Sequence, residues 1–137
     1  MNIFRNILAV FVGLVVGSIV NMAVIMISGA LIPLPEGADL STTEGLKAAM
    51  PLMEFKHFIM PFLAHALGTL VGAFIAALIA INNTLNMARI VGVLFLIGGI
   101  MMVVQIPTTP LWFKIVDLVF AYIPMACIGG RLVSSNK

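Results

Sequence analysis

Long uncharged stretches of the sequence alternate with short segments that carry nearly all of the charges. Three stretches contain no Asp, Glu, Lys or Arg, and they cover residues 6–35, 58–88 and 90–113. Each is longer than the ~20 apolar residues that an α-helix needs to cross the hydrocarbon core of a bilayer. The pattern therefore predicts three membrane-spanning helices, over about residues 7–32, 58–81 and 90–106.

A fourth spanning helix is expected over about residues 111–133, although Lys114 and Asp117 lie near its start. Residues 118–130 are uncharged, and Trp112 falls where aromatic side chains gather at a membrane interface. Four crossings therefore fit the pattern better than three.

Composition agrees with a lipid environment. Hydrophobic residues make up 62% of the 137 residues and charged residues only 9%, whereas roughly 25% of the residues in a typical soluble domain are charged. We therefore expect an all-α integral membrane bundle of four transmembrane helices, forming a single domain over residues 1–137, with the lipid bilayer as its first partner. The basic residues are scattered and the net charge is only +2, so no basic face for nucleic acid is expected.

The first apolar stretch also has features of a secretory signal peptide. Arg5 would form its basic region, and residues 28–30 could serve as a small-residue cleavage site. However, the apolar stretch that begins at Ile7 is longer than the 7–15 residues of an ordinary signal-peptide core. We therefore expect a retained membrane span.

The distribution of Lys and Arg predicts the orientation. With four spans, both termini lie on the same side of the membrane as the connection at residues 82–89. That side carries four basic residues, namely Arg5, Arg89, Arg131 and Lys137. The opposite side carries three, namely Lys47, Lys56 and Lys114. The positive-inside rule therefore places both termini in the cytoplasm, by a margin of one residue.

Residues 33–57 form the only substantial connection and are expected on the non-cytoplasmic side. Ser41 and Glu44 have the spacing of a capping box, which predicts a helix that starts after Ser41 and ends near Met50, where Pro51 stops it. Its apolar side favours a position along the membrane interface. The alternative is a lid over a cavity between the spans.

Small residues form a stripe on each of the first two predicted spans. The first stripe is Gly13, Gly17 and Asn21, and the second is His65, Gly68, Thr69, Gly72 and Ala76. Helices in lipid associate through close backbone contact and hydrogen bonds, because burial of apolar surface gains little there. We expect the two stripes to meet as antiparallel neighbours. A homodimer contact through one of them is the alternative.

Three polar residues within the spans are the candidate functional positions. His65 and Asp117 each lie about five residues outward from the middle of their predicted helices, or roughly 7 Å above the midplane, and Asn21 lies slightly deeper. We expect the three side chains to form one layer. Buried ionisable groups often mark proton or substrate pathways, and an Asp117–His65 pair could exchange protons near physiological pH. The structural interpretation, in which His65 bonds Asn21 or a backbone carbonyl and locks the bundle, is favoured.

No cofactor, metal site or catalytic residue is expected. Glu54 and His57 have the Glu-x-x-His spacing of di-iron bundles, but those proteins require two such motifs and two further glutamates. Cys127 is the only cysteine, so it cannot form an intramolecular disulfide, and it is interpreted as a small apolar residue in the helix packing. The patterns of nucleotide-binding loops and nucleophile elbows are absent from the sequence.

Two segments of the chain carry a family resemblance. They are residues 54–73, which contain Glu-Phe-Lys-His-Phe and Pro-Phe-Leu-Ala-His-Ala-Leu-Gly-Thr-Leu-Val-Gly-Ala, and residues 116–130, which contain Val-Asp-Leu, Ile-Pro-Met and Gly-Gly. Both resemble a group of short uncharacterised bacterial four-helix membrane proteins. The resemblance implies a location in the bacterial inner (cytoplasmic) membrane and brings no known activity.

Three functional interpretations follow. The first is a non-enzymatic accessory or assembly subunit whose small-residue faces dock another membrane protein. The second is a homo-oligomeric small channel or proton-coupled transporter that uses the layer of Asn21, His65 and Asp117. The third, ranked last, is a membrane enzyme that acts on a lipid or a quinone.

Overall fold

A computed structural model describes residues 2–137 of the chain, and within them every regular element is a helix. The helices are α1 (Asn2–Leu31), α2 (Thr43–Ala49), the 3-10 turn η1 (Met50–Leu52), α3 (Lys56–Ile79), α4 (Thr84–Gln105), α5 (Leu111–Phe120) and α6 (Ile123–Ser134). Four helical segments are long and apolar enough to cross a membrane, the fourth being α5 and α6 together. The all-α fold class is therefore confirmed.

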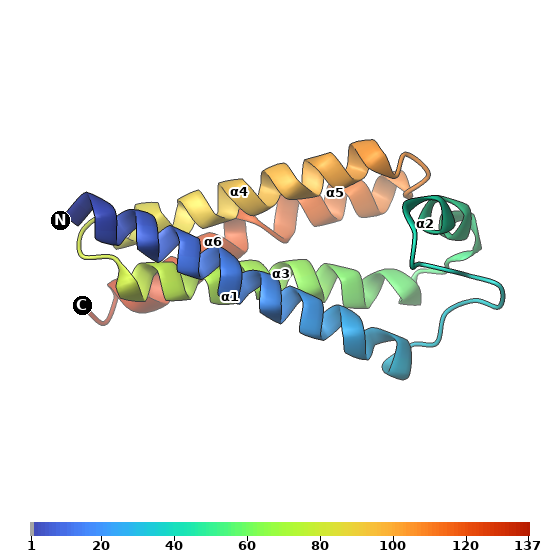
Figure 1. Cartoon of the computed structure of the whole chain (residues 1–137), viewed down its shortest axis with the longest axis horizontal. Helices are drawn as coiled ribbons and strands as arrows, with labels where there is room; N and C mark the ends of the chain where they lie inside the picture. Colours follow the sequence, from blue (N-terminus) through green and yellow to red (C-terminus); the bar gives the residue numbers. More distant parts are fainter. Residues whose placement is uncertain (1) are drawn as a thin grey trace.

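The long helices run side by side in one elongated bundle (Figure 1). Helix α1 packs mainly on α3, and α6 fills the space between α3 and α4. Both ends of the chain and the α3–α4 turn lie at one end of the bundle, while α2 lies at the other (Figure 1). We refer to these as the terminal end and the α2 end.

The helices start and stop within a few residues of the predicted positions, with two larger differences. Helix α1 begins at Asn2 rather than near residue 7, and α4 begins at Thr84 rather than near residue 90. The first turns of both helices contain polar residues. Such residues can be helical, although they lie outside the apolar stretches from which the spans were predicted. The α3–α4 turn is closed by Asn83, whose φ of 53° is one of the left-handed conformations that asparagine tolerates.

Glycines bring α1 and α3 into backbone contact. A Cβ atom built on Gly13 would lie 2.5 Å from the carbonyl oxygen of Gly72, and one built on Gly17 would lie 2.5 Å from the carbonyl oxygen of Gly68. No larger side chain fits at either position without a backbone shift. The stripes that the sequence predicted therefore face each other within one chain.

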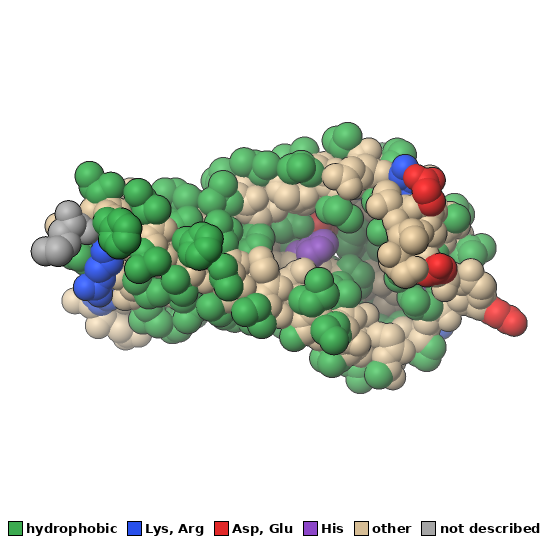
Figure 2. Space-filling view, viewed as in Figure 1, with side chains coloured by type: hydrophobic (Ala, Val, Ile, Leu, Met, Phe, Trp, Pro, Cys, Tyr) green, Lys and Arg blue, Asp and Glu red, His purple; other side chains and the backbone are tan. Residues whose placement is uncertain are grey.

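Small residues also line the contacts of α6. Gly129 lies against the backbone of Leu70 on α3, and Gly92 on α4 lies against Ala126. The buried core beside them consists largely of alanines, namely Ala73, Ala76, Ala77, Ala88 and Ala126, with Val91 and Val133. The larger aliphatic side chains point outward, and they cover much of the surface in Figure 2.

The predicted fourth helix is broken. It consists of α5 and α6, which are separated at Ala121 and Tyr122. Pro124 explains the break, because proline has no N–H and its ring clashes with the carbonyl group four residues earlier, which belongs to Phe120. The prediction of one continuous helix over residues 111–133 is therefore wrong at Pro124.

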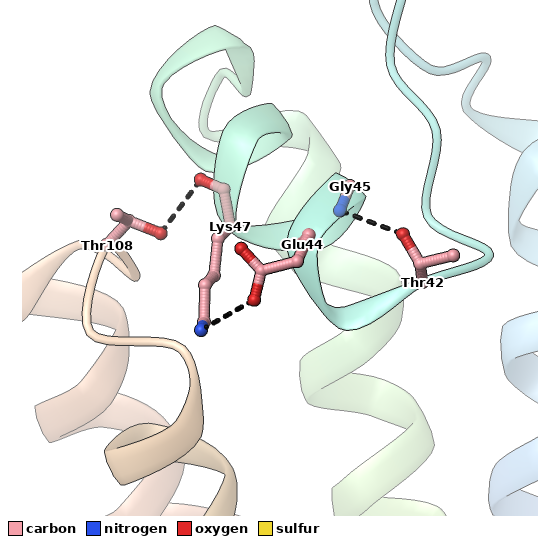
Figure 3. Close-up of polar contacts among 5 residues, drawn as sticks. All are labelled: Thr42, Glu44, Gly45, Lys47 and Thr108. Atoms are coloured by element: carbon pink, nitrogen blue, oxygen red, sulfur yellow. Dashed lines mark hydrogen bonds and ion pairs between the residues drawn. The ribbon is translucent and has the colours of Figure 1, made fainter.

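The predicted capping box is wrong. Thr42, and not Ser41, is the N-cap of α2, and its Oγ1 accepts a hydrogen bond of 3.0 Å from the backbone N–H of Gly45 (Figure 3). Ser41 instead donates to Asp39 through both its hydroxyl and its backbone N–H. Asp39 competes successfully for Ser41 because both donors reach one carboxylate oxygen, at 2.6 and 2.9 Å.

Helix α2 is attached to the connection between α4 and α5. Glu44 pairs with Lys47 at 3.1 Å, and Thr108 Oγ1 donates a hydrogen bond of 2.9 Å to the carbonyl oxygen of Lys47 (Figure 3). Helix α2 ends at Ala49, next to the predicted end at Met50, and the chain then passes Pro51 in the 3-10 turn η1. Proline is tolerated there because the first positions of a helix need no N–H donor.

Polar side chains close the opposite end of α3. Arg5 Nε donates to the carbonyl oxygen of Ile79, and Lys137 Nζ donates to those of Ala77 and Ala80. The last carbonyl groups of a helix have no partner within it and carry partial negative charge, so cations are favourable there. These contacts fix the terminal end of the bundle.

Candidate functional site

The bundle contains a direct contact between His65 on α3 and Asp117 on α5. His65 Nδ1 lies 2.8 Å from Asp117 Oδ1, across 52 positions of sequence. The Asp117 side chain is only 6% exposed, whereas that of His65 is 29% exposed. The pair therefore has one enclosed member and one that is still accessible.

Tyr122 completes the cluster. Its hydroxyl group donates a hydrogen bond of 3.1 Å to Asp117 Oδ2, and its ring stacks on the imidazole of His65 with centroids 5.8 Å apart. On α3, the hydroxyl of Thr69 bonds to the carbonyl oxygen of His65. We call the side chains of His65, Asp117 and Tyr122 the His65–Asp117–Tyr122 cluster.

The hydrogen bonds define the role of each atom in the cluster. As a carboxylate, Asp117 accepts one hydrogen bond on each oxygen, from Tyr122 and from Nδ1–H of His65. A neutral histidine that donates through Nδ1 carries a lone pair on Nε2. Within residues 2–137, Nε2 of His65 has no hydrogen-bond partner, and this atom is not fully enclosed. In its neutral form, His65 therefore offers one free acceptor.

Asn21 lies near the cluster without bonding to it. It lines a cavity of about 230 Å³ together with His65, Thr69 and Tyr122. Its Oδ1 is enclosed and has no hydrogen-bond partner in the described chain. Of the three polar residues predicted to share a layer, the structure joins His65 and Asp117 and leaves Asn21 beside them. The favoured prediction, a bond from His65 to Asn21 or to a backbone carbonyl, is wrong, because the imidazole bonds the Asp117 carboxylate instead.

A larger cavity of about 350 Å³ leads to the same cluster. It lies in the half of the bundle nearer α2, and His65, Asp117 and Tyr122 line it together with apolar side chains of α1, α3, α4 and the first loop. Figure 2 shows a hollow on this face of the molecule, with a histidine side chain (purple) at its floor. The cluster is thus the polar part of an otherwise mainly apolar chamber.

The α2 end of this cavity is fixed by His57 and by aromatic side chains. His57 Nδ1 accepts a hydrogen bond from the backbone N–H of Glu54, and its Nε2 donates to the carbonyl oxygen of Pro33 at 3.0 Å. Both ring nitrogens are thereby occupied, Nδ1 with Glu54 just before α3 and Nε2 with Pro33 just after α1. Trp112 packs on Phe58 with ring centroids 5.4 Å apart. His57 is therefore a structural residue in this arrangement.

The remaining candidate positions lie apart from the cluster. Among residues 2–137, no group of three or more His, Cys, Asp or Glu side chains is placed to hold a metal ion. Cys127 is half-buried on α6. Lys114 lines the large cavity, but its Nζ donates to the carbonyl oxygen of Pro107 at 3.0 Å.

Tyr122 is the member of the site that the sequence analysis missed. On an uninterrupted helix, residues five positions apart point in directions about 140° apart, so Tyr122 would not face Asp117. The break before Pro124 changes that direction. The only tyrosine of the chain, two residues before a proline within an apolar span, was the available signal.

Comparison with known proteins does not assign the chain to a family. No protein-family model matches the chain, and no curated protein or solved structure matches it either. The chemistry that the site offers is a free imidazole acceptor, supported by a doubly bonded carboxylate, at the polar end of an apolar chamber.

Proposed function

We propose that the chain is an integral membrane protein that crosses the bilayer four times. Helix α1 supports this most strongly, because only 11% of its most apolar window is buried against the rest of the chain. Phe4, Phe11 and Met26 are among its exposed large side chains. A helix that is apolar on all sides and remains uncovered requires lipid as its surroundings.

The proposed orientation places both termini in the cytoplasm and α2 on the opposite side of the inner membrane. Four basic residues then face the cytoplasm, at or beyond the ends of the spans: Arg5, Arg89, Arg131 and Lys137. The positive-inside rule supports this arrangement. The His65–Asp117–Tyr122 cluster then lies in the non-cytoplasmic half of the bilayer.

Within this bundle, the proposed function is the binding of a small, mainly apolar molecule in the large cavity. The observation that carries the proposal is that the cavity of about 350 Å³ ends at the His65–Asp117–Tyr122 cluster. Small-molecule sites typically combine an apolar lining with a few convergent polar groups, and their volumes start near 300 Å³. A carboxylate and an imidazole within the membrane are energetically costly, and such residues usually have a structural or functional role.

The accessory or assembly subunit, which is the first interpretation of the sequence, loses one of its supports. Besides the short loops and the lack of catalytic residues, it used small-residue faces of the helices to dock another membrane protein. Gly13 and Gly17 instead face Gly72 and Gly68 within the chain. The exposed faces of α1 carry larger side chains such as Phe4 and Phe11, which lipid can cover.

Proton-coupled transport, in a homo-oligomer or a single chain, is the second candidate. The hydrogen bond of 2.8 Å between His65 and Asp117 favours it, because such a pair can take up and release a proton with a bound molecule. The close contacts of Gly13 and Gly72 occupy the half of the bundle nearer the terminal end. Transport therefore requires this half to open, which simple binding does not.

Native mass spectrometry of a gently extracted membrane sample tests the binding proposal. We expect the wild-type protein to carry a small apolar molecule. Val103→Trp, which places a large ring in the cavity, should lose it. Val104→Trp is the matched control, because Val104 is 74% exposed and does not line the cavity. Met53→Trp fills the cavity from the loop and replaces Val103→Trp if that variant does not fold.

The outcomes separate the candidate functions. A bound small molecule that is lost in the cavity variants and kept in Val104→Trp supports binding. Absence of any bound molecule together with a stoichiometric second protein would favour the accessory-subunit role instead. In reconstituted vesicles, dissipation of a pH gradient that is abolished by Asp117→Asn, but not by Asp39→Asn in the exposed loop, would raise transport above simple binding.

A further inference from the structure

Two polar atoms close to the His65–Asp117–Tyr122 cluster have no hydrogen-bond partner within residues 2–137, and of their two residues only His65 lines the large cavity, whereas Asn21 lines the cavity of about 230 Å³ beside it. One is Nε2 of His65, whose other nitrogen is bonded to Asp117. The second is Oδ1 of Asn21, which is enclosed and unpaired. A buried acceptor such as Asn21 Oδ1 normally has a partner, because leaving one unpaired costs about 1–3 kcal/mol, whereas Nε2 of His65 is accessible from the cavity side of a side chain that is 29% exposed. The site therefore lacks a donor, and a ligand can supply it.

The lining of the cavity restricts the rest of the ligand. Apart from the cluster, most lining residues are apolar, including Ile25, Met60 and Met102. A charged head group would lose its hydration in such surroundings, and a carboxylate head would also be repelled by Asp117. Lys114, the one cation that residues 2–137 place on the lining, is engaged with the carbonyl oxygen of Pro107. The lining therefore favours an uncharged molecule with an apolar body.

The hollow opens on the long side of the bundle. Helices α1 and α4 contact each other where Phe95 packs on Gly17, and they diverge from there toward the α2 end (Figure 1). Beyond this contact, Ser28 on α1 and Met102 on α4 line the cavity from its two sides. Figure 2 shows the hollow between these helices in a view perpendicular to the long axis. In the proposed membrane orientation, this opening faces lipid.

We propose that the cavity takes an uncharged amphiphile with a single hydroxyl head group, such as a long-chain alcohol or a phenol, which enters from the bilayer between α1 and α4. The hydroxyl group donates its hydrogen bond to His65 Nε2, and Asp117 and Tyr122 hold the imidazole with Nε2 directed at the ligand. This inference rests on the proposed binding function and adds the chemical class of the ligand and its route of entry.

The hydroxyl group is tested with two probes of equal chain length. 1-Dodecanol can donate a hydrogen bond, whereas dodecyl methyl ether cannot. Both are titrated into the protein in lipid nanodiscs, with the fluorescence of Trp112 as the signal, because this only tryptophan packs on the cavity residues Phe58 and Phe113. We expect Kd for the alcohol to be about five- to tenfold lower than for the ether, the difference that one neutral hydrogen bond makes.

Variants of His65 assign that difference to one atom. His65→Phe should bind both probes with similar Kd, because it removes the acceptor and keeps a ring of comparable shape. His65→Gln should restore part of the preference for the alcohol, because its side-chain oxygen is again an acceptor. Binding of the ether serves in each variant as the measure that the cavity is still formed.

The route of entry is tested by the rate of association from ligand-loaded vesicles. Ser28→Phe places a ring at the opening and should slow association about tenfold or more, with the ratio of the two Kd values unchanged. Ala30→Phe is the matched control on the same helix, because Ala30 is exposed and does not line the cavity. Equal rates for these two variants would overturn entry between α1 and α4.

The remaining outcomes distinguish this inference from the proposed function. If neither probe binds the wild-type protein, the binding function itself fails. If the ether binds as tightly as the alcohol, binding stands and the hydroxyl-specific contact with His65 is wrong. Tighter binding of dodecylammonium than of 1-dodecanol would also overturn the uncharged head group, because it would show that the Asp117 charge selects a cation.

Discussion

The Tyr122 hydroxyl group donates a hydrogen bond of 3.1 Å to Asp117, five positions earlier in the chain. The break between α5 and α6 brings the two side chains together, and Pro124 accounts for the break. A residue that interrupts a span thus determines how its only carboxylate is satisfied. Because this carboxylate also binds His65, the break shapes the whole cluster.

Removal of the phenol hydroxyl tests this relationship. Tyr122→Phe leaves Asp117 Oδ2 without its donor, and we expect the free energy of unfolding to fall by about 1–2 kcal/mol. The measurement is unfolding in detergent by circular dichroism. A double-mutant cycle with Asp117→Asn isolates the pair, and a coupling energy near zero would show that the hydrogen bond contributes nothing.

The glycine contact between α1 and α3 gives a second prediction. A methyl group on Gly72 would lie 2.6 Å from the carbonyl oxygen of Gly13, so Gly72→Ala forces the helices apart and should cost about 1–3 kcal/mol. Gly98→Ala is the matched control, because nothing lies within 4 Å of its added Cβ and alanine favours a helix. Equal thermal stability of the two variants would contradict the close helix contact.

The attachment of α2 to the rest of the chain is a separate, local feature. Thr108→Val removes the hydrogen bond to the carbonyl oxygen of Lys47 and keeps the shape of the side chain. We expect faster amide hydrogen exchange in α2, with the exchange of α3 and α4 unchanged, because only the loop loses a contact. Thr43→Val provides the comparison, since Thr43 makes no side-chain hydrogen bond to another helix. Unchanged exchange in α2 would show that this bond does not restrain it.

Asp39 supplies a prediction about pH. Hydrogen bonds from the side chain and then from the backbone of Ser41 lower the pKa of its carboxyl group below 3.8. A lowered folded-state pKa stabilises the fold above the unfolded pKa, and this contribution is lost as pH falls through the folded value. In Ser41→Ala the pKa of Asp39 should rise toward 3.8, as measured by carboxyl NMR titration. Thr43→Ala should leave it unchanged, and an equal rise there would point to a general change of the loop.

The arrangement of the long helices could largely be predicted from the sequence, and the reasons are physical. Uncharged stretches of sufficient length identify the candidate spans, and the spacing of Gly13 and Gly17 identifies the face of α1 that approaches another backbone. Each of these signals lies within a single segment, so it can be recognised without knowledge of which helices become neighbours. The pairing of His65 with Asp117 could be suggested only from their similar depth.

The remaining features depend on competition between neighbouring residues, and the sequence pattern does not show which of them prevails. Ser41 and Thr42 are both suitable N-caps, and the position of Asp39 decides between them by engaging Ser41. The sequence contains Pro124, but the new direction of Tyr122 depends on how α6 packs against α3 and α4. A cavity between the spans could be named only as an alternative, and its position and size could not be predicted, because they depend on how far α1 and α4 diverge beyond Gly17.

The number and direction of the membrane crossings can be measured directly by cysteine labelling. In a Cys127→Ala background, single cysteines at Ser41, Asn83 and Ser135 are exposed to a membrane-impermeant maleimide in intact cells. We predict that position 41 is labelled at once, and that positions 83 and 135 react only after the membrane is permeabilised. Labelling of all three positions from outside, or release of the chain from membranes by alkaline carbonate, would contradict the four-crossing bundle on which the binding cavity depends.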